Sequence, residues 1–156
     1  MLRIKIPGHE TMDLTHLVLD YNGTLACDGR ILDGVKERVE TLARSLEIHV
    51  LTADTFGSVR RELAELPCRL AVIPLENQAE AKLHHVLVLG SQHCVCIGNG
   101  HNDRLMLQAA ALGIAVLQTE GAAMAAVIAA DILAPGIADA LDLLLHPLRL
   151  AATLRS

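Results

Sequence analysis

Leu17-Val18-Leu19-Asp20-Tyr21-Asn22-Gly23-Thr24 joins a short apolar run to a carboxylate and a glycine turn. The apolar run is typical of a strand buried on both faces, as in a parallel sheet. A carboxylate at the end of such a strand, followed at once by a turn, is where α/β proteins place nucleophiles. The stretch therefore predicts an α/β fold with Asp20 at its functional edge.

Outward from this stretch, short apolar runs alternate with longer helical segments. The sequence predicts strands at 2–6, 16–19, 48–51, 70–73, 94–97, 115–117 and 132–133, and helices at 33–46, 55–66, 77–89, 103–112, 121–130 and 136–145. Alternating strands and helices are typical of βαβ units and a parallel sheet. We therefore expect a three-layer α/β/α, Rossmann-like architecture.

The organisation of the chain favours one domain over residues 1–156, because no repeat, low-complexity tract or Pro/Gly/Ser-rich linker divides it. Within it, residues 25–32 carry Asp28-Gly29 between apolar neighbours, a pattern that predicts a small β-hairpin flap. Asp54 and Thr55 are expected to cap the helix that follows them. The apolar segment 143–150 is expected to pack onto the sheet, with a partner-binding helix as the alternative.

Composition narrows the classes of partner. The formal net charge is −5 and aromatic residues make up 1% of the chain, so neither a nucleic-acid backbone nor a stacked base is an expected ligand. The uncharged apolar stretches are shorter than the roughly 18 residues that a membrane span needs, and the first residues do not resemble a signal peptide. We expect a cytoplasmic protein with no membrane contact.

Neither the cysteines nor the histidines form a pattern typical of a metal site. Cys94 and Cys96 point to the same face of one predicted strand, so we expect reduced core thiols. A metal at His93-Cys94-Val95-Cys96 is the alternative, but a second ligand pair at zinc spacing is missing. His101 is expected to face solvent, and structural roles are expected for His9, His16, His49, His84, His85 and His146.

Three further segments place chemically useful groups after predicted strands. Thr52 ends the strand 48–51, and its hydroxyl could bond a phosphoryl oxygen. Lys82, early in the helix 77–89, could neutralise a carboxylate and phosphate oxygens, with an exposed helix lysine as the alternative. The segment Ile97-Gly98-Asn99-Gly100-His101-Asn102-Asp103 is a glycine turn before a helix. Asp103 suggests a cation site, either as a ligand of the cation or as a residue that positions its ligands.

Together these four segments resemble the motifs of the haloacid dehalogenase-like superfamily of aspartate-nucleophile phosphotransferases. They are especially similar to the phosphorylation domain of P-type ATPases and to soluble P-type ATPases, over residues 20 to about 139. The resemblance implies Asp20 as nucleophile with Lys82 beside it, and a Mg²⁺ cofactor. It further implies that phosphate is bound by Thr52, Asn22, Gly23 and Lys82. The metal ligands that it implies are Asp20, Asn22 (through its main-chain carbonyl), Asn99 and Asp103. The residues that it implies as supports of the site are Thr24, Asn102, Gly98 and Gly100.

Two positions depart from the family pattern. Asn22 stands where phosphatases of the family place a general acid–base carboxylate, and Asn99 where they place the principal Mg²⁺-binding aspartate. Loss of a general acid–base group typically costs 10²–10⁴-fold in rate, or about 3–5 kcal/mol of barrier. We therefore expect slow discharge of an aspartyl-phosphate and weak Mg²⁺ affinity.

The spacing of the motifs leaves no room for a cap domain beyond the hairpin flap. Only 31 residues separate Asp20 from Thr52, and 29 separate Thr52 from Lys82. Capless members of the family often shield the site by oligomerising, so the resemblance implies a homo-oligomer, either a dimer or a tetramer.

These observations predict a Mg²⁺-dependent phosphoryl-transfer hydrolase, phosphatase-like or ATPase-like, that acts slowly on a small phosphorylated substrate or phosphate ester. The alternative is a catalytically weak or inactive relative that binds a phospho-ligand or a protein partner. A phosphorelay receiver domain is a third interpretation, but Tyr21 stands where that class needs an acidic pair.

Overall fold

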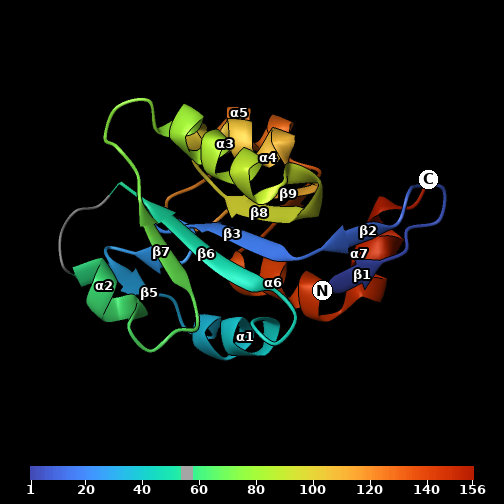
Figure 1. Cartoon of the computed structure of the whole chain (residues 1–156), viewed down its shortest axis with the longest axis horizontal. Coiled ribbons are helices and arrows are strands. Elements are labelled where there is room, and N and C mark those ends of the chain that lie inside the picture. Colours follow the sequence, from blue (N-terminus) through green and yellow to red (C-terminus); the bar gives the residue numbers. More distant parts are fainter. Residues whose placement is uncertain (54–57) are drawn as a thin grey trace.

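The computed structural model describes residues 1–53 and 58–156 (Figure 1). A six-stranded sheet with strand order β10-β9-β8-β3-β6-β7 lies at its centre, and every neighbouring pair of strands is parallel. The strands are β3 (His16–Asp20), β6 (Glu47–Thr52), β7 (Arg69–Val72), β8 (Cys94–Gly98), β9 (Leu112–Val116) and β10 (Ile132–Ala134). The expected parallel sheet is confirmed.

Helices cover both faces of this sheet (Figure 1). One face carries α1 (Val35–Leu42) and α6 (Ile137–Leu145), and the other carries α3 (Gln78–Leu89), α4 (Arg104–Ala109) and α5 (Met124–Ala129). Alternate residues of β3 belong to different core clusters, because successive side chains of a strand point to opposite faces: Leu17 and Leu19 to one, Val18 to the other. The three-layer α/β/α architecture is confirmed.

The expected hairpin flap is also present. β4 (Ala26–Cys27) and β5 (Arg30–Ile31) pair in antiparallel fashion around Asp28 and Gly29, whose φ angles are 51° and 79°. Two positive φ angles are what a two-residue hairpin turn requires, which explains the Asp-Gly pair. The Tyr21 hydroxyl donates a hydrogen bond of 2.9 Å to the Gly29 carbonyl, so the flap is tied to the end of β3.

Two predicted strands differ from the structure. β1 (Leu2–Ile4) is shorter than the predicted strand 2–6, and it pairs with β2 (Met12–Leu14) in a separate antiparallel sheet. β9 begins at Leu112, inside the predicted helix 103–112, and α4 already ends at Ala109. Gly113 lies against the main chain of Leu107, where a β-carbon would collide. An apolar run this short is compatible with a helix end as well as with a strand.

The remaining elements are short helices. α2 (Ser58–Leu63) falls within the predicted helix 55–66, whose proposed caps, Asp54 and Thr55, lie outside the described residues. The 3-10 helices η1 (Ser91–His93) and η2 (His101–Asp103) precede β8 and α4. α7 (Pro147–Leu154) contributes the buried Leu150 to the larger core cluster, as expected of a packed terminal helix. Across the described ranges, no helix is long and apolar enough to cross a bilayer.

Candidate active site

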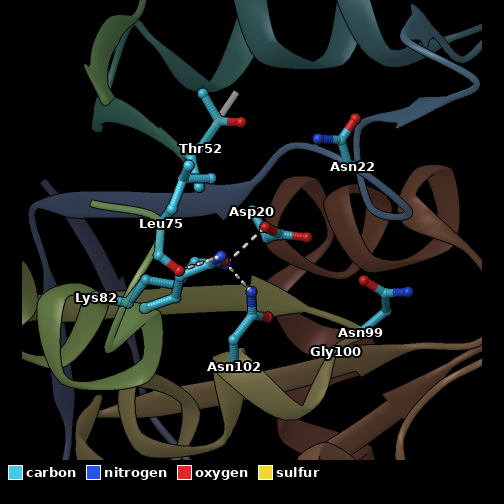
Figure 2. A pocket seen from close by; sticks show the side chains of 10 residues that line it. Asp20, Asn22, Thr52, Leu75, Lys82, Asn99, Gly100 and Asn102 are labelled. Atoms are coloured by element: carbon cyan, nitrogen blue, oxygen red, sulfur yellow. Dashed lines mark hydrogen bonds and ion pairs between the residues drawn. The ribbon is translucent and has the colours of Figure 1, made fainter. Parts of the chain in front are cut away.

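The predicted site residues gather at the carboxyl ends of β3, β6 and β8 (Figure 2). They line a pocket of about 620 Å³, whose lining residues are Asp20, Asn22, Thr52, Ala53, Leu75, Gln78, Lys82, Asn99, Gly100 and Asn102. In a parallel sheet the carboxyl ends of neighbouring strands meet at one edge, which is where α/β proteins bind ligands. Segments far apart in the sequence thus form one cavity.

Asp20 is the last residue of β3 and is 7% exposed. The chain turns sharply after it, because the Tyr21 carbonyl accepts hydrogen bonds from the main-chain N–H groups of Thr24, Leu25 and Ala26. Gly23 has a φ of 78°, a conformation that disfavours other residues. This turn brings the Thr24 hydroxyl back to donate a hydrogen bond of 3.1 Å to Asp20 Oδ2.

Lys82 is 1% exposed, which excludes the alternative of an exposed helix lysine. Its ammonium donates to Asp20 Oδ1 at 2.7 Å and to Asp103 Oδ1 at 2.6 Å. One buried positive charge is therefore shared between two buried carboxylates. The cluster is left with one unbalanced negative charge when all three groups are ionised.

The pKa values of the cluster reflect burial first and the arrangement of its charges second. Burial, and next the nearby Asp103 carboxylate, raise the pKa of Asp20 to about 7 in spite of Lys82 and Thr24. For Lys82, burial opposes the charged form, but the two carboxylates outweigh it and raise the pKa above its usual value. The ammonium is retained, and a further cation near Asp20 would stabilise the ionised nucleophile.

Asp103 holds the glycine loop after β8. Its Oδ2 accepts hydrogen bonds from the main-chain N–H groups of Asn99 and Gly100, at 3.0 and 2.8 Å. A β-carbon at Gly98 would collide with this carboxylate, so glycine is needed there. Because both oxygens of Asp103 already have partners, the geometry favours a positioning role, and direct metal binding by Asp103 stays a prediction.

Asn99 presents its side-chain oxygen to the nucleophile. Its Nδ2 donates a hydrogen bond of 3.0 Å to the Gly121 carbonyl, which leaves Oδ1 3.4 Å from Thr24 Oγ1, on the side of Asp20 (Figure 2). An amide oxygen is a suitable ligand for Mg²⁺, and the unbalanced negative charge of the cluster favours a cation here. The carboxylate of Asp20 and the amide oxygen of Asn99 therefore fit Mg²⁺. They carry one negative charge fewer than the motif that the chain resembles, which has an aspartate at the position of Asn99.

The other predicted residues lie around the same cavity. Thr52 is buried at the end of β6, whereas Asn22 is exposed in the turn after β3, and both line the pocket. Asn102 donates a hydrogen bond of 2.7 Å to Gln78 Oε1, which joins η2 to the start of α3. His101 is exposed, as expected.

Two residues near the site lacked a sequence signal. Gln118 follows β9 and donates to the carbonyls of Gly23 and Thr24, at 2.9 and 2.8 Å, and its Oε1 accepts a hydrogen bond from the Ile137 N–H. The Glu120 carboxylate, with the Asn99 amide, lies where a β-carbon of Gly23 would be. Gln118 and Glu120 are distant in sequence from the turn after β3. The local sequence pattern therefore could not indicate that they lie near it.

The fold brings two of the histidines into a cluster that their sequence spacing did not reveal. Among the described residues, His16, Glu47 and His49 have ligand-type atoms within 4.8 Å of one another. They share no short sequence spacing, because the pairing of β3 with β6 brings them together. This cluster lies at the amino ends of the strands, away from Asp20.

Comparison with known proteins links the chain first to two archaeal relatives, whereas no family model matches it. Both relatives are uncharacterised proteins of Methanocaldococcus jannaschii. One is 51% identical over 61 residues, which are 39% of this chain and 66%, just under two thirds, of the relative. The other is 54% identical over 39 residues, which are 25% of this chain and 89% of the relative.

Solved structures give wider coverage at lower identity. A cobalt-bound deoxy-D-mannose-octulosonate 8-phosphate phosphatase from Haemophilus influenzae aligns over 92% of this chain and 94% of its own, with a TM-score of 0.72 and 15% identity. The 3-deoxy-D-manno-octulosonate 8-phosphate phosphatase of Moraxella catarrhalis, in complex with magnesium, phosphate and KDO, aligns over 86% and 87%, with a TM-score of 0.70 and 17% identity.

A zinc-transporting P-type ATPase matches 78% of this chain and 20% of its own, with a TM-score of 0.63 and 22% identity. A hydrolase of the haloacid dehalogenase-like superfamily from Legionella pneumophila aligns over 90% of this chain and 87% of its own, with a TM-score of 0.71 and 17% identity. The chain therefore has the fold of the haloacid dehalogenase-like superfamily.

Proposed function

We propose that this chain is a Mg²⁺-dependent phosphoryl-transfer hydrolase in which Asp20 accepts the phosphoryl group. The observation that carries the proposal is the buried contact of Asp20 with Lys82, both of which line the pocket. Phosphatases with the same fold, one of them solved with magnesium and phosphate, support the reaction class.

In the first step an oxygen of Asp20 attacks phosphorus, the new O–P bond forms, and the bond to the leaving oxygen breaks. Lys82 keeps the carboxylate in place and lies within reach of the phosphoryl oxygens, while the Thr52 hydroxyl can donate to one of them. The cation would be held by Asp20, the Asn22 main-chain carbonyl and Asn99 Oδ1. When bound, Mg²⁺ offsets the negative charge of the phosphoryl oxygens.

The second step, attack of water on the aspartyl-phosphate, is expected to be slow. It needs a base to take a proton from water, and the amide of Asn22 cannot accept one. Asn22 also cannot act as a general acid, so leaving groups that must be protonated are disfavoured. Acyl phosphates and phosphoanhydrides, whose leaving groups are stable anions, are therefore the expected donors rather than sugar phosphates.

Phosphate release from acetyl phosphate and from a sugar phosphate, each with and without Mg²⁺, tests this function. We expect Mg²⁺-dependent release from acetyl phosphate at a higher rate than from the sugar phosphate, and none above background in Asp20→Asn. Equal release by wild type and Asp20→Asn, with both donors, would contradict the proposal.

The second candidate is a binding protein without useful turnover, favoured by the amides at positions 22 and 99. The double variant Asn22→Asp, Asn99→Asp separates the two candidates, because it restores the acid–base group and the metal-binding charge together. A large gain in phosphate release indicates an intact but slow catalytic site. No gain, with phosphate still bound in a calorimetric titration, favours the binding protein.

A further inference from the structure

His16, Glu47 and His49 form a side-chain cluster at the opposite end of the sheet from Asp20. His16 is the first residue of β3 and Asp20 the last, and four steps along a strand span about 13 Å. The register pairs His16 with Glu47 and Val18 with His49. Since alternate residues of a strand share a face, all three side chains lie on the face covered by α3.

The distances within the cluster approach those of a metal site. His16 Nδ1 lies 3.2 Å from His49 Nε2 and 3.6 Å from Glu47 Oε2, and His49 Nε2 lies 4.0 Å from Glu47 Oε1. Ligand atoms about 2.0–2.2 Å from a tetrahedral metal lie about 3.3–3.6 Å from one another. The two distances from His16 Nδ1 are therefore close to those between ligands of a tetrahedral metal, and the ligand-type atoms of all three groups lie within 4.8 Å of one another.

Neighbouring side chains hold two of these groups in place. The second ring nitrogen of His49, Nδ1, lies 3.5 Å from His85 Nε2 on α3, and Arg69 Nε bonds Glu47 Oε1 at 2.7 Å. Contacts of this kind set the orientation and tautomer of metal-binding residues. Because Arg69 takes Oε1, the oxygen of Glu47 that remains for an ion is Oε2, which is the one nearer to His16.

The cluster combines a buried ligand with access to solvent. The side chain of His49 is 5% exposed, whereas those of His16 and Glu47 are 18% and 36% exposed. The open side leaves room for entry of an ion and for a water ligand.

We propose that His16, Glu47 and His49 bind a divalent transition-metal cation of the Zn²⁺ or Co²⁺ type, with water as the fourth ligand. Two imidazoles and one carboxylate suit these borderline metals, whereas Mg²⁺ prefers oxygen ligands alone. The site is separate from the Mg²⁺ site at Asp20 and does not depend on the proposed phosphoryl transfer. A bound ion joins the amino ends of β3 and β6.

Titration of the full chain with Co²⁺, followed by visible absorption, tests this site, because four-coordinate Co²⁺ absorbs strongly in the visible range and six-coordinate Co²⁺ weakly. The titration is done in the Asp20→Asn background, which weakens the other metal site. We expect one equivalent of Co²⁺ with four-coordinate absorption, displaced by Zn²⁺ but not by Mg²⁺. Absence of that absorption at one equivalent overturns the proposal.

Variants at the partly exposed ligands complete the test, since loss of the buried His49 could disturb folding. We expect His16→Ala and Glu47→Gln each to weaken Co²⁺ binding by about tenfold or more, with an unchanged circular dichroism spectrum. The exposed His9, changed to Gln, serves as the matched control and should bind as the parent does. Equal affinity of His16→Ala and His9→Gln overturns the proposal.

Discussion

Asn22 puts a neutral amide where phosphatases of the superfamily that the chain resembles carry a carboxylate, and Asn99 puts one where the superfamily carries its metal-binding aspartate. Their surroundings differ. Asn22 is exposed at the rim of the pocket, whereas Asn99 is buried and held by the Gly121 carbonyl. A carboxylate introduced at position 22 could therefore exchange protons with solvent. The Asn99 amide, in contrast, is held in a fixed orientation toward Asp20.

Replacement of Asn22 by Asp should raise the rate at which the aspartyl-phosphate is hydrolysed, because a carboxylate there can accept a proton from water. A gain of about 10²-fold or more is expected, within the range of general acid–base catalysis. Single-turnover loss of the phosphorylated protein measures it. The control is Asn22→Ala, and a rate for Asn22→Asp no higher than that of the control would refute this role for position 22.

Lys82 is expected to matter for stability as well as for chemistry. Lys82→Met leaves the buried Asp20 and Asp103 without their shared cation, and breaking a buried ion pair in this way costs about 3–5 kcal/mol. Urea unfolding measures the loss. The matched control is Lys36→Met, which removes an exposed ion pair of 2.6 Å, with Glu65, and should have a far smaller effect. Equal losses would argue against a charge-based role for Lys82.

The turn after β3 is fixed by elements far along the chain. Gln118, after β9, bonds two carbonyls of this turn and the first N–H of α6. The turn, the sheet edge and α6 are thus held together by one side chain. Such a link positions Asp20 and Thr24 without contact with substrate.

Gln118→Ala is therefore expected to slow phosphorylation of Asp20 and to destabilise the fold by about 1–3 kcal/mol, the cost of leaving polar groups unpaired. Denaturant unfolding and the rate of adduct formation from acetyl phosphate measure the two effects. Gln108→Ala, at an exposed position of α4, is the control. A Gln118→Ala variant as stable and as fast as the control would show that the link is unimportant.

The elements also show what sequence could and could not predict. Asp20 and Thr52 were predictable because each lies at the carboxyl end of a recognisable strand, and the parallel sheet brings such positions together. Lys82 was predictable from its place early in the helix between Thr52 and the glycine loop. The cluster of His16, Glu47 and His49 was not, because it depends on the register of β3 against β6. The strand 2–6 was misplaced because an alternating pattern does not identify its partner strand.

The whole molecule concentrates a buried negative charge at one end of its sheet, and its stability should depend on pH accordingly. The pKa of Asp20 is raised from 3.8 to about 7, so the folded state keeps a proton that the unfolded chain has released between these values. The Asp20 contribution to stability is therefore present below about pH 4 and is lost as the pH rises towards 7.

This dependence is isolated as the difference in unfolding free energy between wild type and Asp20→Asn, measured from pH 4 to 8. Without metal, we expect the wild type to lose stability relative to the variant as the pH rises. Mg²⁺ should reduce that loss, because a cation favours the ionised carboxylate. A difference that does not change with pH would contradict the raised pKa of Asp20.

The role of Asp20 as nucleophile is tested most simply by the intact mass of the protein after incubation with acetyl phosphate and Mg²⁺. We expect that one phosphoryl group is added, that hydroxylamine removes it, and that Asp20→Asn prevents it. The adduct should persist longer in the wild type than in Asn22→Asp. Asp20 is not the nucleophile if the wild-type protein acquires no phosphoryl group. The same conclusion follows if the Asp20→Asn variant still acquires one.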